Sequence, residues 1–337
     1  MPAGTLSIQR EHIMTTTSAI PPEAAKQAAQ RSKSPGSSAS DPKKRRKRWN
    51  RLSWVGVAFV APAAVYTAVF HLFPVFYGFI LSFTKYSPLS RNGPTFIGLA
   101  NYEALLKSPD FGNALLVTGQ YVLQVLPATI IIALLLALLV NRPFRGVGIA
   151  RSALYIPHIV SLTAVSMVWL WMYFQNGLFN EILGSLGLPD QAWLLDEDTA
   201  LTAASAMRIW KALGSNMILL LAGLQTIPRE LYEAAEMDGA GKWHQFRYVT
   251  LPGVRPVLVF VVAMDIIALA QSFAEIFVLT QGGPLASTTT VNYLIYTQAF
   301  QYNQFGAASA MAFVLFAFIA GFSLLAIRGL TGKQATR

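Results

Sequence analysis

Long stretches without charge are the feature of this sequence that most restricts its fold. No Asp, Glu, Lys or Arg occurs in residues 52–84, 111–141, 152–180 or 276–327. Because one charged side chain costs about 2.5–3.5 kcal/mol at the centre of a membrane helix, such runs are typical of transmembrane segments. About 20 apolar residues are enough to cross the hydrocarbon core of a bilayer. Each run is therefore long enough for at least one crossing.

The composition supports a membrane protein and excludes several other classes. Hydrophobic residues make up 54% of the 337 residues and charged residues only 12%, whereas an ordinary soluble domain carries about 25% charge. The chain has no cysteine, which excludes disulfides, iron–sulfur clusters and cysteine-ligated zinc. Its four histidines are scattered, so we expect no metal site.

The uncharged runs predict an all-α membrane protein with six transmembrane helices. We place the helices at residues 54–83, 113–140, 152–174, 200–224, 256–280 and 305–327. The long last run holds the end of the fifth helix, a polar break at residues 281–284 and the whole sixth helix. Together these helices define one transmembrane domain, residues 54–328.

The distribution of basic residues predicts the orientation. Residues 1–53, 141–151, 225–255 and 328–337 contain 21 of the 26 Lys and Arg residues, and the alternating connections contain three. Since Lys and Arg accumulate on the cytoplasmic side, both termini are predicted to be cytoplasmic. We interpret residues 1–53 as a disordered basic tail whose run at 43–48 contacts anionic lipid rather than nucleic acid. Residues 329–337 form the C-terminal cytoplasmic tail.

The segment 225–255 differs from the other connections. Pro228 suits a first helical turn, and Asp238 with Gly239 predicts a helix end and a turn. A second short helix is expected from residue 242 to about 249, ended by Leu251-Pro252. The apolar flank of these helices favours docking to a partner. An amphipathic loop lying on the lipid surface is the alternative.

This segment resembles the EAA loop of ABC-importer permeases. The resemblance rests on Glu233-Ala234-Ala235, on Gly239 after three further residues, and on Leu251-Pro252. Residues 96–102, 209–211 and 279–284 resemble other motifs of the carbohydrate branch, in particular the first permease of maltose and glycerol-phosphate systems. The resemblance covers roughly residues 54–328 and implies the type I ABC importer permease fold.

The resemblance also implies the partners and the location. Residues 225–255 would be a coupling segment that contacts one of two separate ABC ATPase subunits. Its coupling residues would be Glu233, Ala234, Ala235, Asp238, Gly239, Ala240, Leu251 and Pro252. The other partners would be a second, non-identical permease and an extracytoplasmic solute-binding protein, in a bacterial plasma membrane. ATP and Mg would bind the ATPase, because this sequence has no G-x-x-x-x-G-K-[ST] phosphate loop.

Ionisable residues inside a membrane are functional candidates. The fourth predicted helix carries Arg208 and Lys211, and the fifth carries Asp265 and Glu275. Lys211 and Glu275 lie close enough to a membrane interface to extend their charges toward water. Asp265 either contacts sugar hydroxyls in the translocation pathway or pairs with Arg208 as a structural bridge between helices.

Helical spacing defines the polar face of the proposed pathway. Asp265, Ser272 and Glu275 lie within about 80° of one another on the fifth helix. Asn216 lies on the same arc as Arg208 on the fourth helix. Gln124 on the second helix either lines the pathway or bonds to a neighbouring helix.

The main alternative function is an ion-coupled secondary transporter of a small polar solute, with Asp265 and Arg208 as a charge relay. Such transporters usually contain paired broken helices at the middle of the membrane. The sequence shows no matching pair of interruptions, which favours the permease. An intramembrane enzyme is disfavoured because its candidate residues, His71, His158 and Asp265, fall on separate helices.

Overall fold

The computed structural model describes residues 42–91 and 93–331, which are mainly helical. The chain divides into two units, Met1–Phe70 and His71–Arg337. The described part of the first unit is helix α2 (Pro42–Thr67) and the start of a π-helical turn, Ala68–Leu72. Residues 42–53 are therefore helical, in contrast to the disordered tail predicted for them. Residues 1–41 of that prediction lie outside the described residues.

The second unit begins with α3 (Phe73–Ser82) and a short antiparallel ribbon, in which β1 (Thr84–Lys85) pairs with β2 (Thr95–Phe96). The first helices after the ribbon are α4 (Ala100–Lys107), α5 (Pro109–Val140), α6 (Val147–Ile159), α7 (Leu162–Met172) and α8 (Leu178–Ser185). The remaining helices are α9 (Glu197–Gln225), α10 (Arg229–Met237), α11 (Lys242–Gln245), α12 (Leu251–Ala270), α13 (Ala274–Leu279), α14 (Val291–Tyr296) and α15 (Phe305–Thr331). Two further π-helical turns occupy Phe246–Thr250 and Thr297–Gln301.

Helix α5 shows why these elements form a membrane domain. Its buried face carries small and β-branched residues such as Ala133 and Ala137, while Leu123, Leu135 and Leu139 on the opposite face are exposed. Small residues let membrane helices approach closely, and exposed leucines suit contact with lipid chains. Accordingly, α5 packs closely along α9 over much of its length.

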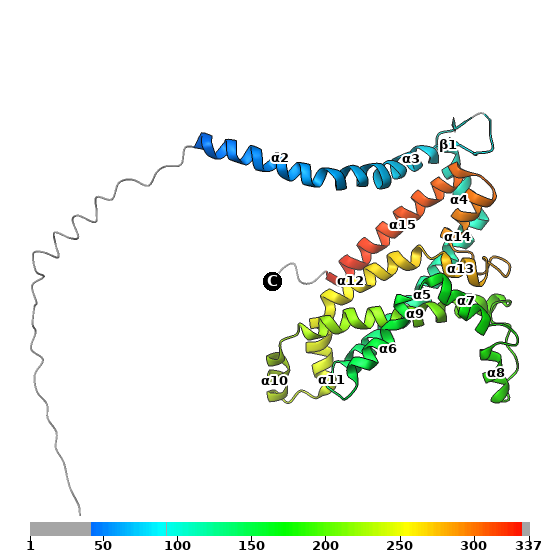
Figure 1. The fold of residues 1–337 in the computed structure, drawn as a ribbon. Helices are drawn as coiled ribbons and strands as arrows, with labels where there is room; N and C mark the ends of the chain where they lie inside the picture. The colour runs from blue at the N-terminus through cyan, green and yellow to red at the C-terminus, as the bar shows by residue number, and fades with distance from the viewer. Residues whose placement is uncertain (1–41, 92, 332–337) are drawn as a thin grey trace, which may run out of the picture. The chain divides into compact units, whose positions relative to one another are not determined.

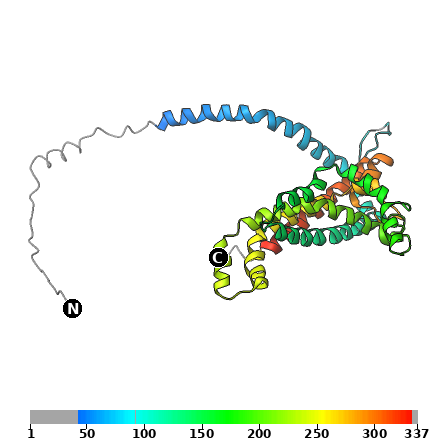
Figure 2. The ribbon, with the colours of Figure 1, turned by 60° about the horizontal axis from the view of Figure 1, so that its bottom comes forward.

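The helices of the second unit gather into a bundle with two distinct ends. Helices α5, α9 and α12 contact one another, α6 packs along α9, and α15 packs against α3 and α12. Helices α10 and α11 lie at one end of α9 and α12, and α7, α13 and α14 lie at the other end (Figures 1 and 2). One end holds α10 and α11 of the segment 225–255, and the other holds α13, which carries Glu275.

Within the described residues, four helices are long and apolar enough to cross a membrane. They are Gly56–Ser82, Pro109–Val140, Lys242–Ala270 and Phe305–Leu325, and the bent pair Val147–Ile159 and Leu162–Met172 adds a fifth candidate. Helix α9 coincides with the predicted fourth span but carries several charges, including Arg208 and Lys211. The protein is therefore a helical, multi-pass membrane protein.

The third and fifth predicted spans are both interrupted, which corrects two expectations. Helices α6 and α7 meet at an angle of 95° around Val160 and Ser161. Helix α12 ends at Ala270, and α13 begins at Ala274 after a break at residues 271–273. Both predicted spans were expected to be unbroken helices, and each is instead built from two helices. Pro157, which cannot donate a backbone hydrogen bond, lies in the last turn of α6 and is a sequence signal of the first break.

The predicted helix end at Leu251-Pro252 is also wrong, because the chain remains helical from Lys242 to Ala270. A proline ring clashes with the carbonyl four residues earlier in an α-helix. Here that carbonyl belongs to Tyr248, in the π-helical turn, and Leu251 N–H donates to Phe246 O. The wider winding of the π-helical turn accommodates Pro252 without ending the helix.

Candidate coupling segment and transmembrane polar site

The coupling segment, residues 225–255, contains a well-formed helix end at Gly239. The N–H of Gly239 donates to Glu236 O at 3.0 Å, and the N–H of Ala240 donates to Ala235 O at 2.8 Å. This pair of bonds is the Schellman arrangement, in which the residue after the helix cap adopts the left-handed conformation. Gly239 does so with φ of 75°. The predicted stop and turn at Asp238 and Gly239 are confirmed.

Side-chain contacts connect the coupling segment to the start of α12. The hydroxyls of Tyr232 and Thr250 lie 3.0 Å apart, which ties α10 to the π-helical turn before α12. A Cβ on Gly253 would lie 2.7 Å from Cδ1 of Ile227, so the connection after α9 packs tightly against α12. Movement of α10 would therefore be transmitted to both α9 and α12.

The surface of α10 offers an uncovered face to a partner. Glu233 and Ala234 are exposed, and Met237 is 89% exposed. The Arg229–Glu233 ion pair, at 3.7 Å, is exposed, and such pairs contribute little to stability. Ala235 and Leu251 are half-buried, while Pro252 is exposed. The predicted coupling residues thus lie on and around one projecting helix, where a protein partner could reach them.

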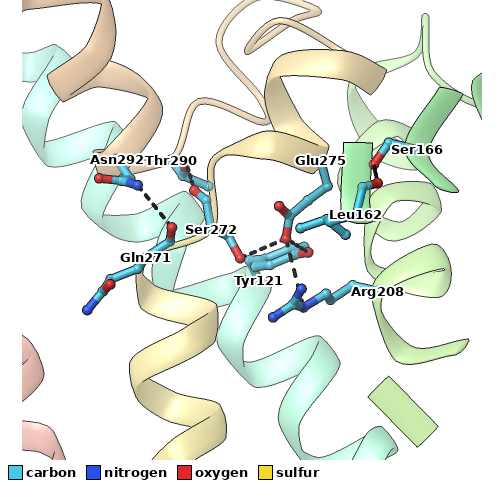
Figure 3. A network of polar contacts seen from close by, with 9 residues as sticks. All are labelled: Tyr121, Leu162, Ser166, Arg208, Gln271, Ser272, Glu275, Thr290 and Asn292. Carbon is cyan, nitrogen blue, oxygen red and sulfur yellow. Dashed lines mark hydrogen bonds and ion pairs between the residues drawn. The ribbon is translucent and has the colours of Figure 1, made fainter. Parts of the chain in front are cut away.

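The second candidate site is a buried polar network centred on Glu275 (Figure 3). Tyr121 of α5 donates its hydroxyl to Glu275 Oε1 at 3.0 Å, and Ser272 donates to the same oxygen at 2.9 Å. Arg208 Nε of α9 lies 3.9 Å from this oxygen. Glu275 is 1% exposed, so the prediction that it extends toward water is wrong. Its charge is balanced inside the bundle instead.

The predicted alternative of an Arg208–Asp265 bridge is wrong. Asp265 Oδ2 accepts a hydrogen bond from Asn216 Nδ2 at 2.6 Å, while the ion pair of Arg208 is with Glu275. Gln124 is bonded between helices, since Ser205 Oγ donates to Gln124 Oε1 at 2.9 Å. The polar residues of α9 therefore contact α5 and the α12–α13 region as separate pairs.

The Glu275 network leaves two buried polar atoms without hydrogen bonds. They are Glu275 Oε2 and Arg208 Nε. A cavity of about 230 Å³ borders both residues and is also lined by Leu162 and by the break at residues 271–273. Because buried polar atoms are costly unless they are bonded, this cavity suits a polar group that donates to the carboxylate.

Residues of the following loop and helix stabilise the break itself. Thr290 Oγ1 donates to Ser272 O at 3.0 Å, and Asn292 Nδ2 donates to Gln271 O at 2.9 Å (Figure 3). These bonds satisfy carbonyls near the break in α12. Sequence reasoning missed Thr290, Asn292 and Tyr121. The polar pair Gln271-Ser272 inside an apolar run was the signal that could have located the break.

Lys211 supports the other break. Its Nζ lies 2.6 Å from Val160 O, 3.1 Å from Pro157 O and 3.3 Å from His158 O. The side chain is buried, with 7% exposed, so the predicted extension toward water is wrong. A lysine has three donors, and here all three face carbonyls that the end of α6 leaves free.

Comparisons with known proteins agree with this architecture. A family model described as "Binding-protein-dependent transport system inner membrane component" matches residues 96–330. The sulfoquinovosyl glycerol transport system permease protein SmoG of Agrobacterium fabrum is 34% identical over 276 residues, covering 80% of this chain and 90% of that protein. The arabinooligosaccharides transport system permease protein AraP of Bacillus subtilis is 36% identical over 277 residues, covering 80% of this chain and 86% of that protein.

Solved structures share the fold. A chain of a bacterial ABC transporter involved in import of the acidic polysaccharide alginate matches with a TM-score of 0.76 and 22% identity, covering 86% of this chain and 99% of that chain. A chain of the bacterial alginate ABC transporter in complex with an alginate pentasaccharide-bound periplasmic protein matches with a TM-score of 0.72. The helix arrangement is therefore that of an ABC importer permease.

Proposed function

Because this chain belongs to the family of binding-protein-dependent transport system inner membrane components, we propose that it moves a sugar or sugar-like solute into the cell. Two relatives support this solute class, since one is a permease of a sulfoquinovosyl glycerol transport system and the other of an arabinooligosaccharides transport system. The observation that carries the function is the match of the family model to residues 96–330, which include both the coupling segment and the polar network.

The proposed topology has six membrane crossings and cytoplasmic termini. Helix α9 supplies a further crossing, although its charged residues keep it out of the set of apolar candidates. Its 29 residues would span about 44 Å. Its ionisable residues Arg208 and Lys211 bond inside the bundle rather than facing lipid. The excess of Lys and Arg in residues 1–53, 141–151 and 225–255 supports the orientation.

The coupling segment is proposed to contact a separate ATP-hydrolysing subunit, two copies of which would serve the transporter. Glu233 would make a polar contact, Ala234 and Ala235 would permit close packing, and Gly239 would form the turn. Asp238, Ala240, Leu251 and Pro252 would shape the base of the contact. ATP and Mg would bind that subunit, since this sequence contains no phosphate loop.

Two further partners complete the proposed assembly. A second, non-identical permease would close the pathway, because one six-helix bundle encloses too little surface for a sugar. An extracytoplasmic solute-binding protein would deliver the solute, a role supported by the similarity to an alginate transporter crystallised with its periplasmic protein.

The proposed pathway runs past polar residues of α5, α9, α12 and α13 and of the break at residues 271–273. It includes Asp265, Ser272, Glu275, Asn216, Arg208 and Gln124. The unbonded Glu275 Oε2 beside a cavity of about 230 Å³ supports this assignment, since sugar hydroxyls are donors.

We expect Asp265→Asn to reduce uptake about tenfold without removing the protein from the membrane. The amide oxygen can still accept the bond from Asn216, so packing is preserved. The lost interaction is a charge-assisted bond to the solute, whose loss corresponds to about one order of magnitude. Uptake of labelled solute and immunoblots of membranes measure the two quantities. Unchanged uptake would remove Asp265 from the pathway.

The proposed function is tested by reconstituting the chain with its ATPase subunits, second permease and binding protein in liposomes. ATP should drive uptake in the absence of any ion gradient. Uptake driven by a proton or sodium gradient without ATP would instead support the secondary transporter.

A further inference from the structure

Two interrupted spans, α6–α7 and α12–α13, both contact helix α9, which is not interrupted. The α6–α7 pair bends by 95° and α12 is interrupted before α13. Helix α9 runs without interruption from Glu197 to Gln225. The segments beyond the two breaks, α7 and α13, pack against each other. A position on α9 that contacts both breaks would therefore control both together.

One turn of α9 makes these two contacts. Lys211 donates to the carbonyls of Pro157, His158 and Val160, which belong to the end of α6 and its bend. Arg208, three residues earlier and so on the same side of the helix, forms the ion pair with Glu275 in the first turn of α13.

Helices α9 and α6 approach each other closely beside Lys211. A Cβ on Gly214, one turn beyond Lys211, would lie 2.0 Å from Leu154 O. The two backbones therefore touch directly beside the lysine. The Lys211 bonds and this contact fix the end of α6 relative to α9.

The same helix leads into the coupling segment. Helix α9 ends at Gln225, and α10 begins at Arg229. Lys211 lies about 21 Å from Gln225 along the helix axis. A helix without a break transmits a displacement at its end along its length, whereas α6–α7 and α12–α13 can bend at their interruptions.

We propose that the Arg208–Lys211 turn of α9 transmits movement of the coupling segment to both helix breaks, with Lys211 as the positioning residue for α6 and α7. This inference rests on the proposed function of the coupling segment. Displacement of α9 pulls the carbonyl end of α6 through Lys211 and the start of α13 through Arg208. The cavity between them, bordered by Leu162 and Glu275, changes shape as a result.

The test measures solute transported per ATP hydrolysed by the reconstituted complex. Lys211→Met has a similar length but no donors, and Lys211→Arg keeps the charge and several donors. Lys107→Met, at an exposed position in the last turn of α4, is the matched control.

We expect Lys211→Met to keep ATP hydrolysis stimulated by the loaded binding protein while uptake per ATP falls about tenfold, the order of loss expected for bonds to a charged donor. Lys211→Arg should restore part of the uptake per ATP hydrolysed. Lys107→Met should give the same uptake per ATP as the unaltered protein. A normal ratio in Lys211→Met overturns the proposal, as does an equal loss of hydrolysis and uptake.

A second variant covers the case in which Lys211→Met does not assemble. Lys211→Gln keeps two donors and is measured in the same way, with the same outcomes. If neither variant assembles, Lys211 is required for folding rather than for transmission, and the proposal is rejected. Failure of the unaltered complex to use ATP would instead contradict the proposed function.

Discussion

Gly239→Pro is expected to reduce ATP-dependent uptake about 100-fold, the order of loss that a small displacement of a functional contact produces. The φ of Gly239 is 75°, whereas a proline ring fixes φ near −65°. Proline also removes the N–H that donates to Glu236 O at 3.0 Å. The Schellman end of α10 would be lost, and the helix would be presented to its partner at a different angle. Uptake by membrane vesicles measures the effect.

Two variants separate this geometric effect from a general effect of substitution. Gly239→Asn should retain most uptake, because asparagine adopts the left-handed conformation more readily than other residues. Gly241→Pro, two residues along the chain, should also retain it, since the φ of Gly241 is −66° and suits proline. Equal loss in all three variants would show that the turn geometry at Gly239 is not what matters.

Gly214→Ala is expected to lower the stability of the folded chain by about 3 kcal/mol, the upper part of the usual range for overpacking. A Cβ here would lie 2.0 Å from Leu154 O and 2.8 Å from Tyr155 Cα. Both atoms belong to the backbone of α6, so no side-chain rotation relieves the overlap. The thermal unfolding midpoint of the purified chain in detergent and the amount of protein in membranes measure the effect.

Gly119→Ala is the matched control for this prediction. Gly119 lies within α5, and a Cβ there meets no atom within 4 Å. Replacing a helical glycine by alanine in open space is expected to raise stability by about 0.5–1 kcal/mol. An unfolding midpoint of Gly214→Ala equal to that of Gly119→Ala would contradict the close α6–α9 contact.

Features set by local sequence were predictable. The uncharged run at 111–141 located α5, because one charge in a membrane helix costs more than most packing contacts supply. Pro228 and Gly239 located the start and end of α10, because their backbone preferences restrict the helix directly. The grouping of Arg208 with residues of the fifth span was also found, although its partner was misassigned.

The partner of Arg208 was misassigned because Glu275 was expected near the membrane interface, whereas it is buried in the bundle with 1% exposed. The depth of Glu275 was counted along one continuous helix at residues 256–280, but the chain is broken at residues 271–273. Asp265 then meets Asn216, and Glu275 meets Arg208 and Tyr121. The periodicity of polar residues predicts which side of a helix they share. It does not predict where the helix is interrupted.

The role of Lys211 was not predictable for a related reason. The long side chain of an intramembrane lysine was expected to extend toward water. Here its partners are backbone carbonyls freed by the bend of another helix, and backbone groups carry no sequence signal of their own. Pro157 indicated the bend, but nothing in the sequence indicates which side chain satisfies the carbonyls.

The coupling segment is proposed to dock on an ATP-hydrolysing subunit and to convert hydrolysis into helix movement. The chain has no cysteine, so a single Met237→Cys substitution introduces the only thiol, at a position that is 89% exposed. A thiol-directed photocrosslinker at this site, in vesicles that take up solute, should capture the ATP-hydrolysing subunit and stop uptake. Crosslinks that never contain that subunit, in vesicles where solute still enters, would contradict the claim.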